Sequence, residues 1–322
     1  MAQNLWKSNA RDNRSLIRSG EARLVGWSRR MLYSGFNILP RSVIRSASSI
    51  DRSDNLDVMS LELMLELKSE RWSDLNHAYG VASDIPQWLN DLKSGDAAIS
   101  DAWDNLCHQF TVYSATFATV PHILLYAKTA TAEELFESLV FIGTVHARRQ
   151  PKEIDATPSD ILEWYDRSVL TAANLALERF LNGKLDDTNA IYLLEAVAGL
   201  QGCSGPGRIL SGFADGEFTI ECPGCKFELY VWPETSGGFF AASSDPVFNP
   251  ESKRTDVAPA SPPPAWDGKS FECSEAFIWL SEISIRAGYP KLASSLRYLY
   301  GNITCPECSN EFNLMRELEN AT

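Results

Sequence analysis

The sequence lacks long apolar stretches and the motifs on which many common enzymes depend. No run approaches the roughly 18–20 apolar residues of a membrane span, and the first residues show no apolar core of a secretory signal. The chain has only four histidines. It contains no His-Glu-x-x-His, no phosphate-binding Gly-x4-Gly-Lys, no dinucleotide-binding glycine turn and no Gly-x-Ser-x-Gly elbow. We therefore expect a cytoplasmic protein that is not an enzyme.

Positive charge is scarce outside the first 52 residues. Those residues hold ten Lys/Arg and three acidic residues, a balance of +7, so the rest of the chain carries −20 of the total of −13. An acidic body repels the phosphates of nucleic acids, and we do not expect it to bind them. A basic protein is a natural partner for such a surface. The alternative interpretation is that the acidic residues only keep the protein in solution.

Four of the seven cysteines form two Cys-Pro-x-Cys pairs, which are Cys222 with Cys225 and Cys305 with Cys308. A Cys-x2-Cys turn directs two thiolates at one metal ion, and two such turns complete a tetrahedral zinc site with no vacant position. We therefore predict one structural Zn²⁺ bound by these four residues. Two unrelated pairs or a redox dithiol are the alternatives, because 79 residues (226–304) separate the pairs. The other three cysteines are interpreted as small buried residues: Cys107, Cys203 and Cys273.

Residues 1–56 differ from the rest of the chain, being rich in Arg and Ser and poor in acids. They are predicted to be a disordered or non-native extension. Three interpretations stay open: a disordered basic arm, an organelle transit peptide, or sequence upstream of a true start at Met59.

Residues 57–215 show helical periodicity and no convincing strand. Gly95 and Gly183 are expected to end helices, and Thr131 with Glu134 forms a capping box that begins one. The apolar stripe of the second helix continues to Phe110. The predicted helices cover about residues 84–94, 99–110, 121–125, 131–147, 159–182 and 188–200.

An internal echo supports stacked helices. The pattern Trp-x-x-Leu-x-His occurs twice, 31 residues apart, as Trp72, Leu75 and His77 and as Trp103, Leu106 and His108. Repeats of about 30–45 residues are typical of solenoids, whose units bury their faces against neighbours. The predicted fold is therefore mainly α: a HEAT-like α-solenoid over 57–215, followed by a small zinc-ribbon β module.

Residues 216–322 are predicted to form a split zinc ribbon. Alternating residues flank the first cysteine pair at 217–220 and 227–231 and follow the second pair at 311–314. Between the pairs we expect a Gly/Ser/Pro-rich surface loop over 235–269 and helices over 271–287 and 290–300.

The segments 75–86 (LNHAYGVASDIP) and 108–115 (HQFTVYSA), followed by Val-Pro at 120–121 and the split CPxC ribbon, carry a family likeness. With them the chain resembles a group of uncharacterised bacterial proteins with HEAT-like helical repeats over about residues 60–315. This resemblance implies a helical-repeat fold and a structural zinc ion, and it implies no activity.

Our leading hypothesis is a non-enzymatic protein-interaction scaffold, such as an immunity-type protein that binds a basic partner. The first alternative is an enzyme or small-ligand-binding protein with an inter-helix pocket lined by His77, Asp84 and His108. The second is a regulator that associates with nucleic acids through the zinc ribbon.

Overall fold

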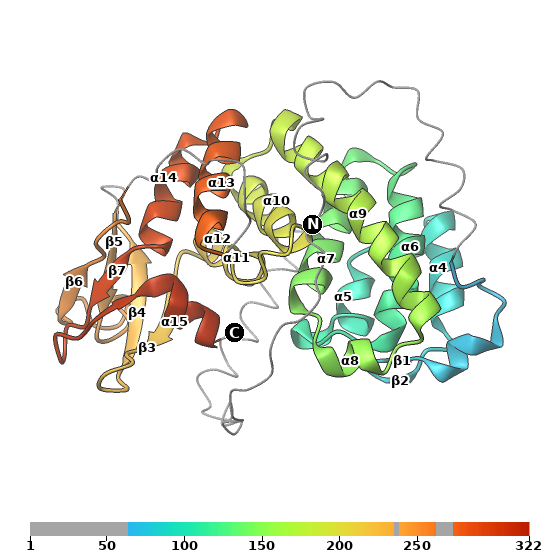
Figure 1. Ribbon diagram of the computed structural model, residues 1–322, viewed down its shortest axis with the longest axis horizontal. Coiled ribbons are helices and arrows are strands. Elements are labelled where there is room, and N and C mark those ends of the chain that lie inside the picture. Colours follow the sequence, from blue (N-terminus) through green and yellow to red (C-terminus); the bar gives the residue numbers. More distant parts are fainter. Residues whose placement is uncertain (1–63, 235–237, 262–272, 322) are drawn as a thin grey trace. The chain divides into compact units, whose positions relative to one another are not determined.

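The computed structural model describes residues 64–234, 238–261 and 273–321 (Figure 1). Residues Leu65–Thr322 belong to one compact unit, which is mainly helical with a small C-terminal sheet region, as the sequence predicts. The predicted basic extension over 1–56 lies outside the described residues. None of the described helices combines the length and the apolar character that crossing a membrane requires.

The first part of this unit is helical apart from one small hairpin. Its elements are η2 Glu70–Asp74, β1 Asn76–His77, β2 Gly80–Val81, α4 Ile85–Ser94, α5 Asp101–Asn105, η3 His108–Phe110, α6 Ser114–Ala127, α7 Ala132–Arg148, α8 Pro151–Asp155, α9 Ser159–Asn182, α10 Asp187–Leu200, α11 Pro206–Ile209 and α12 Gly212–Asp215. The HEAT-like stacking of helix pairs stays a prediction.

Local capping signals set several helix ends where the sequence predicts them. Gly95 adopts a left-handed conformation (φ 83°) directly after α4. The Thr131 hydroxyl accepts from the amide of Glu134, whose carboxylate accepts from the amide of Thr131, so the capping box begins α7. The amide of Gly183 donates to the carbonyl of Arg179 after the last turn of α9.

Two expectations for this part are wrong. The second helix stops at Asn105 instead of continuing to Phe110, because Gln109 and Phe110 both take left-handed backbone conformations (φ 48° and 63°) and turn the chain. Residues 57–215 also contain a pair of strands, the β1–β2 hairpin, in which Asn76 lies opposite Val81. Strands of two residues are too short to produce an alternating pattern in the sequence.

The sequence echo marks two successive units of similar build. Each has a short helix, a turn and a longer helix: η2, the β1–β2 hairpin and α4 in the first, and α5, η3 and α6 in the second. In each unit the tryptophan lies in the short helix and a buried leucine follows it, namely Trp72 with Leu75 and Trp103 with Leu106.

Helices α7, α10 and α11 approach one another closely because glycines lie at their crossings. A Cβ atom added at Gly143 would lie 2.5 Å from the Cα of Ala196, and one at Gly207 would lie 2.5 Å from the Cα of Gly199. No side chain larger than hydrogen fits these contacts without moving a backbone. The crossing therefore depends on glycine in both α7 and α10.

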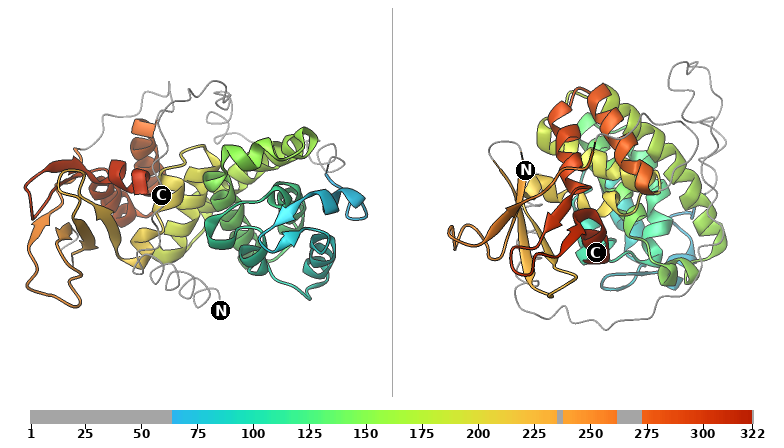
Figure 2. Two further views of the ribbon diagram at one scale, coloured as in Figure 1. Left: turned by 90° about the horizontal axis from the view of Figure 1, so that it is seen from below. Right: turned by 60° about the vertical axis from the view of Figure 1, so that its left-hand side comes forward.

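The second part of the unit carries the strands and two more helices, grouped at one end in Figures 1 and 2. The elements are β3 Phe218–Glu221, β4 Glu228–Pro233, β5 Phe239–Ala242, β6 Arg254–Asp256, α13 Cys273–Arg286, α14 Pro290–Leu299, β7 Asn302–Thr304, β8 Glu311–Asn313 and α15 Leu314–Ala321. Strands β3–β4–β5–β6 form one antiparallel sheet, and β7–β8 form a separate pair.

The expectation of a surface loop over 235–269 is wrong for part of that range. Strands β5 and β6 lie within it, and all four residues of β5 are buried, including Phe239 and Phe240. The many Gly, Ser and Pro residues of the region conceal these short strands, which are stabilised by pairing with β4 rather than by local preference. Residues 262–269 lie outside the described residues.

Candidate metal centre

The two cysteine pairs lie in turns between strands of matching register. In the first strand pair Ile220 lies opposite Leu229, and in the second Ile303 lies opposite Phe312. All four side chains are buried. Each residue of the second pair follows its counterpart by 83 positions, the same offset that relates Cys222 to Cys305. The alternating residues beside the cysteines therefore anchor both turns to the core in the same way.

The backbones of the two turns, called knuckle 1 (222–227) and knuckle 2 (305–310), make the same hydrogen bonds. In knuckle 1 the amide of Cys222 donates to the carbonyl of Phe227 at 2.9 Å, and the amide of Lys226 donates to the carbonyl of Cys222 at 2.9 Å. In knuckle 2 the equivalent bonds join Cys305 with Asn310 at 2.8 Å and Ser309 with Cys305 at 3.0 Å. Lys226 and Ser309 are both left-handed, with φ of 64° and 60°.

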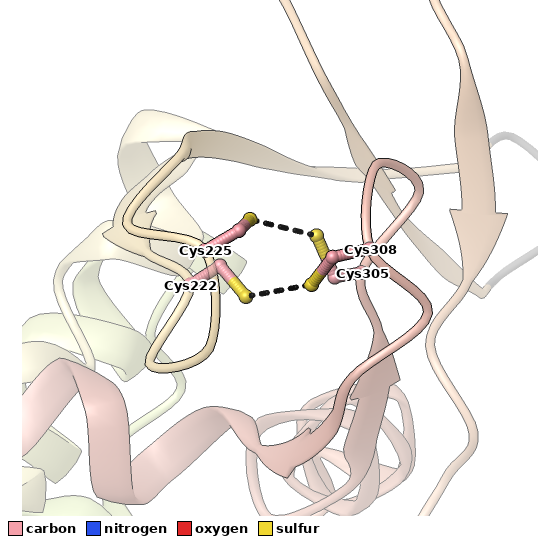
Figure 3. Close-up of side chains that lie close together, drawn as sticks. All are labelled: Cys222, Cys225, Cys305 and Cys308. Atoms are coloured by element: carbon pink, nitrogen blue, oxygen red, sulfur yellow. Dashed lines mark hydrogen bonds between the residues drawn. The ribbon is translucent and has the colours of Figure 1, made fainter.

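The four sulfur atoms face one another across the gap between the knuckles (Figure 3). The Sγ atoms of Cys222 and Cys308 are 3.7 Å apart, those of Cys225 and Cys305 are 3.8 Å apart, and all four lie within 4.8 Å of one another. A tetrahedron with zinc–sulfur distances of about 2.3 Å has edges of about 3.8 Å. The structure thus brings all four predicted ligands together at a spacing that is compatible with one zinc ion.

The β5–β6 hairpin joins the two knuckles. The hydroxyl of Thr255 in β6 donates to the carbonyl of Thr304 in β7, and Ala258 pairs with Asn302 as an isolated bridge. Lys253 lies 2.7 Å from the carboxylate of Glu307 in knuckle 2. Because β5 pairs with β4 and β6 contacts β7, the long segment between the cysteine pairs positions one knuckle against the other.

Gly224 is required by the close approach of the knuckles. A Cβ atom at this position would lie 3.1 Å from both Cβ and Cγ of Asn310. The equivalent position of knuckle 2, 83 residues later, holds Glu307, whose side chain extends to Lys253 instead. The sequence shows the glycine of CPGC but not its reason, since Asn310 is far away along the chain.

The cluster favours ionisation of one thiol even before a cation binds. Burial opposes loss of the proton from Cys222, yet its pKa falls to about 7 because the amides of Cys225 and Gly224 and two facing thiols donate to the thiolate. Burial and the neighbouring sulfur of Cys222 raise the pKa of Cys305. A divalent cation must displace the remaining protons, so metal affinity is expected to fall as the pH is lowered.

Chemically, four thiolates suit a structural ion. They fill all four positions of a tetrahedral zinc ion, so no position is left for a reactive water or a substrate. Cys222 and Cys305 are buried, whereas Cys225 and Cys308 are exposed, so the centre lies at the surface of the sheet region. A chelator in solution can therefore reach it.

The alternative site residues are only partly brought together. Nε2 of His77 lies 3.0 Å from Oδ1 of Asp84, and its Nδ1 accepts the amide of Tyr79 at 3.2 Å. Both ring nitrogens of His77 thus have partners, and the Nε2 atom carries the proton. His108 lies beyond Tyr79, with ring centroids 5.6 Å apart. The three residues form the base of the β1–β2 hairpin.

A described cavity lies elsewhere, between α10, α12, β5 and α14. Its walls are mainly apolar, with one acidic and one basic side chain at the rim; its lining includes Ile191, Phe213, Phe239, Leu292, Asp187 and Lys291. Neither His77, Asp84 nor His108 lines it.

The two remaining histidines are buried packing residues. Nε2 of His122 lies 2.9 Å from the carbonyl of Leu65, and burial lowers the pKa of His122 to about 4. Nδ1 of His146 lies 2.9 Å from the hydroxyl of Tyr165, and burial lowers the pKa of His146 well below its usual value. Both side chains are therefore neutral at pH 7.

Comparisons of the chain with protein-family models, with curated proteins and with solved structures find no match. The assignment of the metal centre accordingly rests on the identity of the four ligands and on their geometry.

Proposed function

We propose that the protein is a non-enzymatic scaffold that binds a basic protein partner and whose C-terminal part is stabilised by one zinc ion. The ion would be held by Cys222, Cys225, Cys305 and Cys308. HEAT-like stacking of the helices over 57–215 belongs to the same proposal, because stacked helices offer an extended surface to a partner.

The observation that supports a structural rather than catalytic role is the four-sulfur cluster. Sulfur pairs at 3.7 and 3.8 Å match the edges of a closed tetrahedral site, and a closed site cannot activate water. Metal binding of this kind contributes on the order of 10 kcal/mol to folding. The ion then serves the strands that hold it and takes no part in a reaction.

The charge supports the class of partner. The chain after residue 52 carries −20, and exposed acidic side chains are spread over α5, α9 and the strand region. Such a surface attracts a basic protein over about one Debye length, roughly 8–10 Å, and repels phosphate polymers.

Metal analysis tests the first half of the proposal. The full chain, purified without chelator, should contain one zinc per molecule, and the Cys305→Ser variant should contain much less. A Cys107→Ala variant is the matched control, because Cys107 is a buried cysteine outside the cluster. An iron-containing, coloured protein would contradict zinc, since four thiolates also bind iron.

Recovery of the full chain from its host cells under low salt tests the second half. We expect one identified partner with an isoelectric point above about 9, in a fixed ratio, that dissociates at about 0.5 M salt. An unaccompanied chain under all salt conditions would contradict binding. A neutral or acidic partner that resists salt would contradict the electrostatic basis.

A further inference from the structure

The β1–β2 hairpin presents two large apolar side chains to solvent. Tyr79 is 67% exposed and Val81 is 53% exposed, which places both among the most exposed large apolar residues of the described chain. Only Ala78 and Tyr79 separate the two strands, and Gly80 takes the positive φ (129°) that this tight turn needs. Exposing such residues together at the tip of a hairpin is costly unless something covers them.

One edge of the hairpin is open to another strand. Residue pairs in an antiparallel ladder alternate between bonded and non-bonded. The amide of Ala82 donates to the carbonyl of Leu75, so the neighbouring pair, Asn76 and Val81, is non-bonded and its polar groups point outward. On one side the amide of Asn76 donates to the hydroxyl of Ser114. On the other side, no hydrogen bond from the described residues reaches the amide of Val81.

The hairpin is held firmly from beneath. His77 is buried and bonds both Asp84 and the amide of Tyr79, while the amide of Ala78 donates to the carbonyl of Asn105. A surface that is already ordered loses little conformational entropy when it binds, which favours affinity.

A strained turn adjoins the hairpin. Gln109 and Phe110 are consecutive non-glycine residues in the left-handed region, at φ 48° and 63°, directly after His108, whose ring contacts Tyr79. The guanidinium of Arg148 lies 3.9 Å above the ring of Phe110 and holds it in place. Strain of this kind costs about 1–3 kcal/mol per residue and is concentrated at binding and switch sites.

Acidic side chains surround the tip. Asp84 is bonded to His77 with its side chain 67% exposed, Asp74 precedes Leu75 at the base of β1, and Asp104 precedes Asn105, which bonds the turn. All three are exposed. The nearest cation of η2, Arg71, is already paired with Asp160 at 2.7 Å. The net charge around the apolar tip is therefore negative.

We infer that the β1–β2 hairpin is the docking site for an extended, lysine- or arginine-rich segment of a protein partner. The segment would add a strand along β2 with one rung at Val81, place apolar side chains against Tyr79 and Val81, and direct its cations toward Asp74, Asp84 and Asp104. This inference rests on the proposed binding of a basic protein. The acidic rim disfavours nucleic acids and anionic membranes, whose surfaces have the same sign of charge.

A labelled peptide of about ten residues, in which lysine alternates with valine, tests this site on the full chain. We expect the Tyr79→Ser/Val81→Thr variant to weaken binding at least about tenfold, and Asp74→Asn/Asp104→Asn to weaken it about threefold with a smaller salt dependence. Hydrogen exchange should show protection on binding at Val81. A second peptide, with prolines in place of alternate valines, should bind far more weakly because proline cannot pair as a strand.

The matched control is Val247→Thr/Phe248→Ser, in the turn between β5 and β6, where the two side chains are 64% and 76% exposed. This control should change the affinity less than about twofold. Equal weakening by the control, or unchanged binding by the hairpin variant, would overturn the inference. If the partner recovered from the host binds the hairpin variant as well as the native chain, the site is wrong and the scaffold proposal stands. If neither the lysine peptide nor any basic partner binds the native chain, the scaffold proposal itself is wrong.

Discussion

The helices α6–α10 and the strands β3–β8 keep their structure by different means. The helices run for 14 to 24 residues and bury large side chains completely, among them Phe117, Phe141 and Phe180. The strands are three to six residues long, and β7–β8 have only three pairs. Strand pairs of this size are marginal in water without further support. In the strand region that support is the cluster of four sulfurs.

The difference teaches that two kinds of long-range contact hold this unit together. Helix crossings depend on shape, as where Gly143 and Gly199 let α7 and α10 touch. The knuckles depend on chemistry, because Cys222 and Cys308 are 86 residues apart in the chain and meet as ligands. Each kind of contact can be removed separately, which makes the comparison testable.

Removal of the metal centre should have the largest effect and should be confined to the strand region. The Cys222→Ser/Cys305→Ser variant loses two ligands and with them a contribution on the order of 10 kcal/mol. We expect proteolysis to cut within residues 218–321 while the circular dichroism of the helices largely remains. Cys107→Ala should leave the cleavage pattern unchanged. Simultaneous loss of all helical signal would contradict two separately held regions.

A larger side chain at the α7–α10 crossing should damage the helices and spare the metal. A Cβ atom at Gly199 would lie 2.7 Å from the carbonyl oxygen of Gly143 and 3.0 Å from Cβ of Ala147. Gly199→Leu should therefore lower the free energy of unfolding by about 3 kcal/mol or more in urea titrations. Gly238→Ala is the control, because its nearest contact is 3.8 Å, and it should change stability by less than about 0.5 kcal/mol. Native stability of Gly199→Leu would show that the crossing is not shape-limited.

Acid should destabilise the helical part through His122. Its pKa is about 4 in the folded chain, so the unfolded chain, with an ordinary value near 6.5, binds a proton first as the pH falls. Stability from neutral His122 is therefore present above about pH 6.5 and is lost toward pH 4, amounting to about 2 kcal/mol between pH 7 and pH 5. Urea titrations at both pH values should show a smaller loss for His122→Gln. The difference between variant and native chain removes the effect of acid on the thiolates, and equal losses would refute the role of His122.

The smallest effect should distinguish the two knuckles from each other. Gly224→Val pushes against Asn310, whose Cβ would lie 3.1 Å from the new atom, and should weaken zinc binding about tenfold in a chelator competition. Glu307→Val at the equivalent position of knuckle 2 meets no such contact and loses only an exposed ion pair with Lys253, worth less than about 1 kcal/mol. Equal affinities for the two variants would mean that the knuckles do not press on each other.

Much of the molecule is determined by short segments of sequence. Helix ends at Gly95, Thr131 and Gly183 follow from groups a few residues away, and the strands around the first cysteine pair follow from alternation over four to six residues. The four cysteines predict their own chemistry, because Cys-x2-Cys directs two sulfurs to one point whatever surrounds it. All of these signals act over less than about two helical turns.

Only the tertiary structure decides how such segments meet. It ends α5 before Phe110, since the ring of Phe110 lies under Arg148, 38 residues later, rather than on a helix face. It turns part of the expected loop into β5 and β6, whose pairing with β4 and contacts with β7 bring the second knuckle to the first. The physical reason is that burial, close approach and strand pairing depend on partners distant in the chain, so their energy leaves no local pattern in the amino-acid sequence.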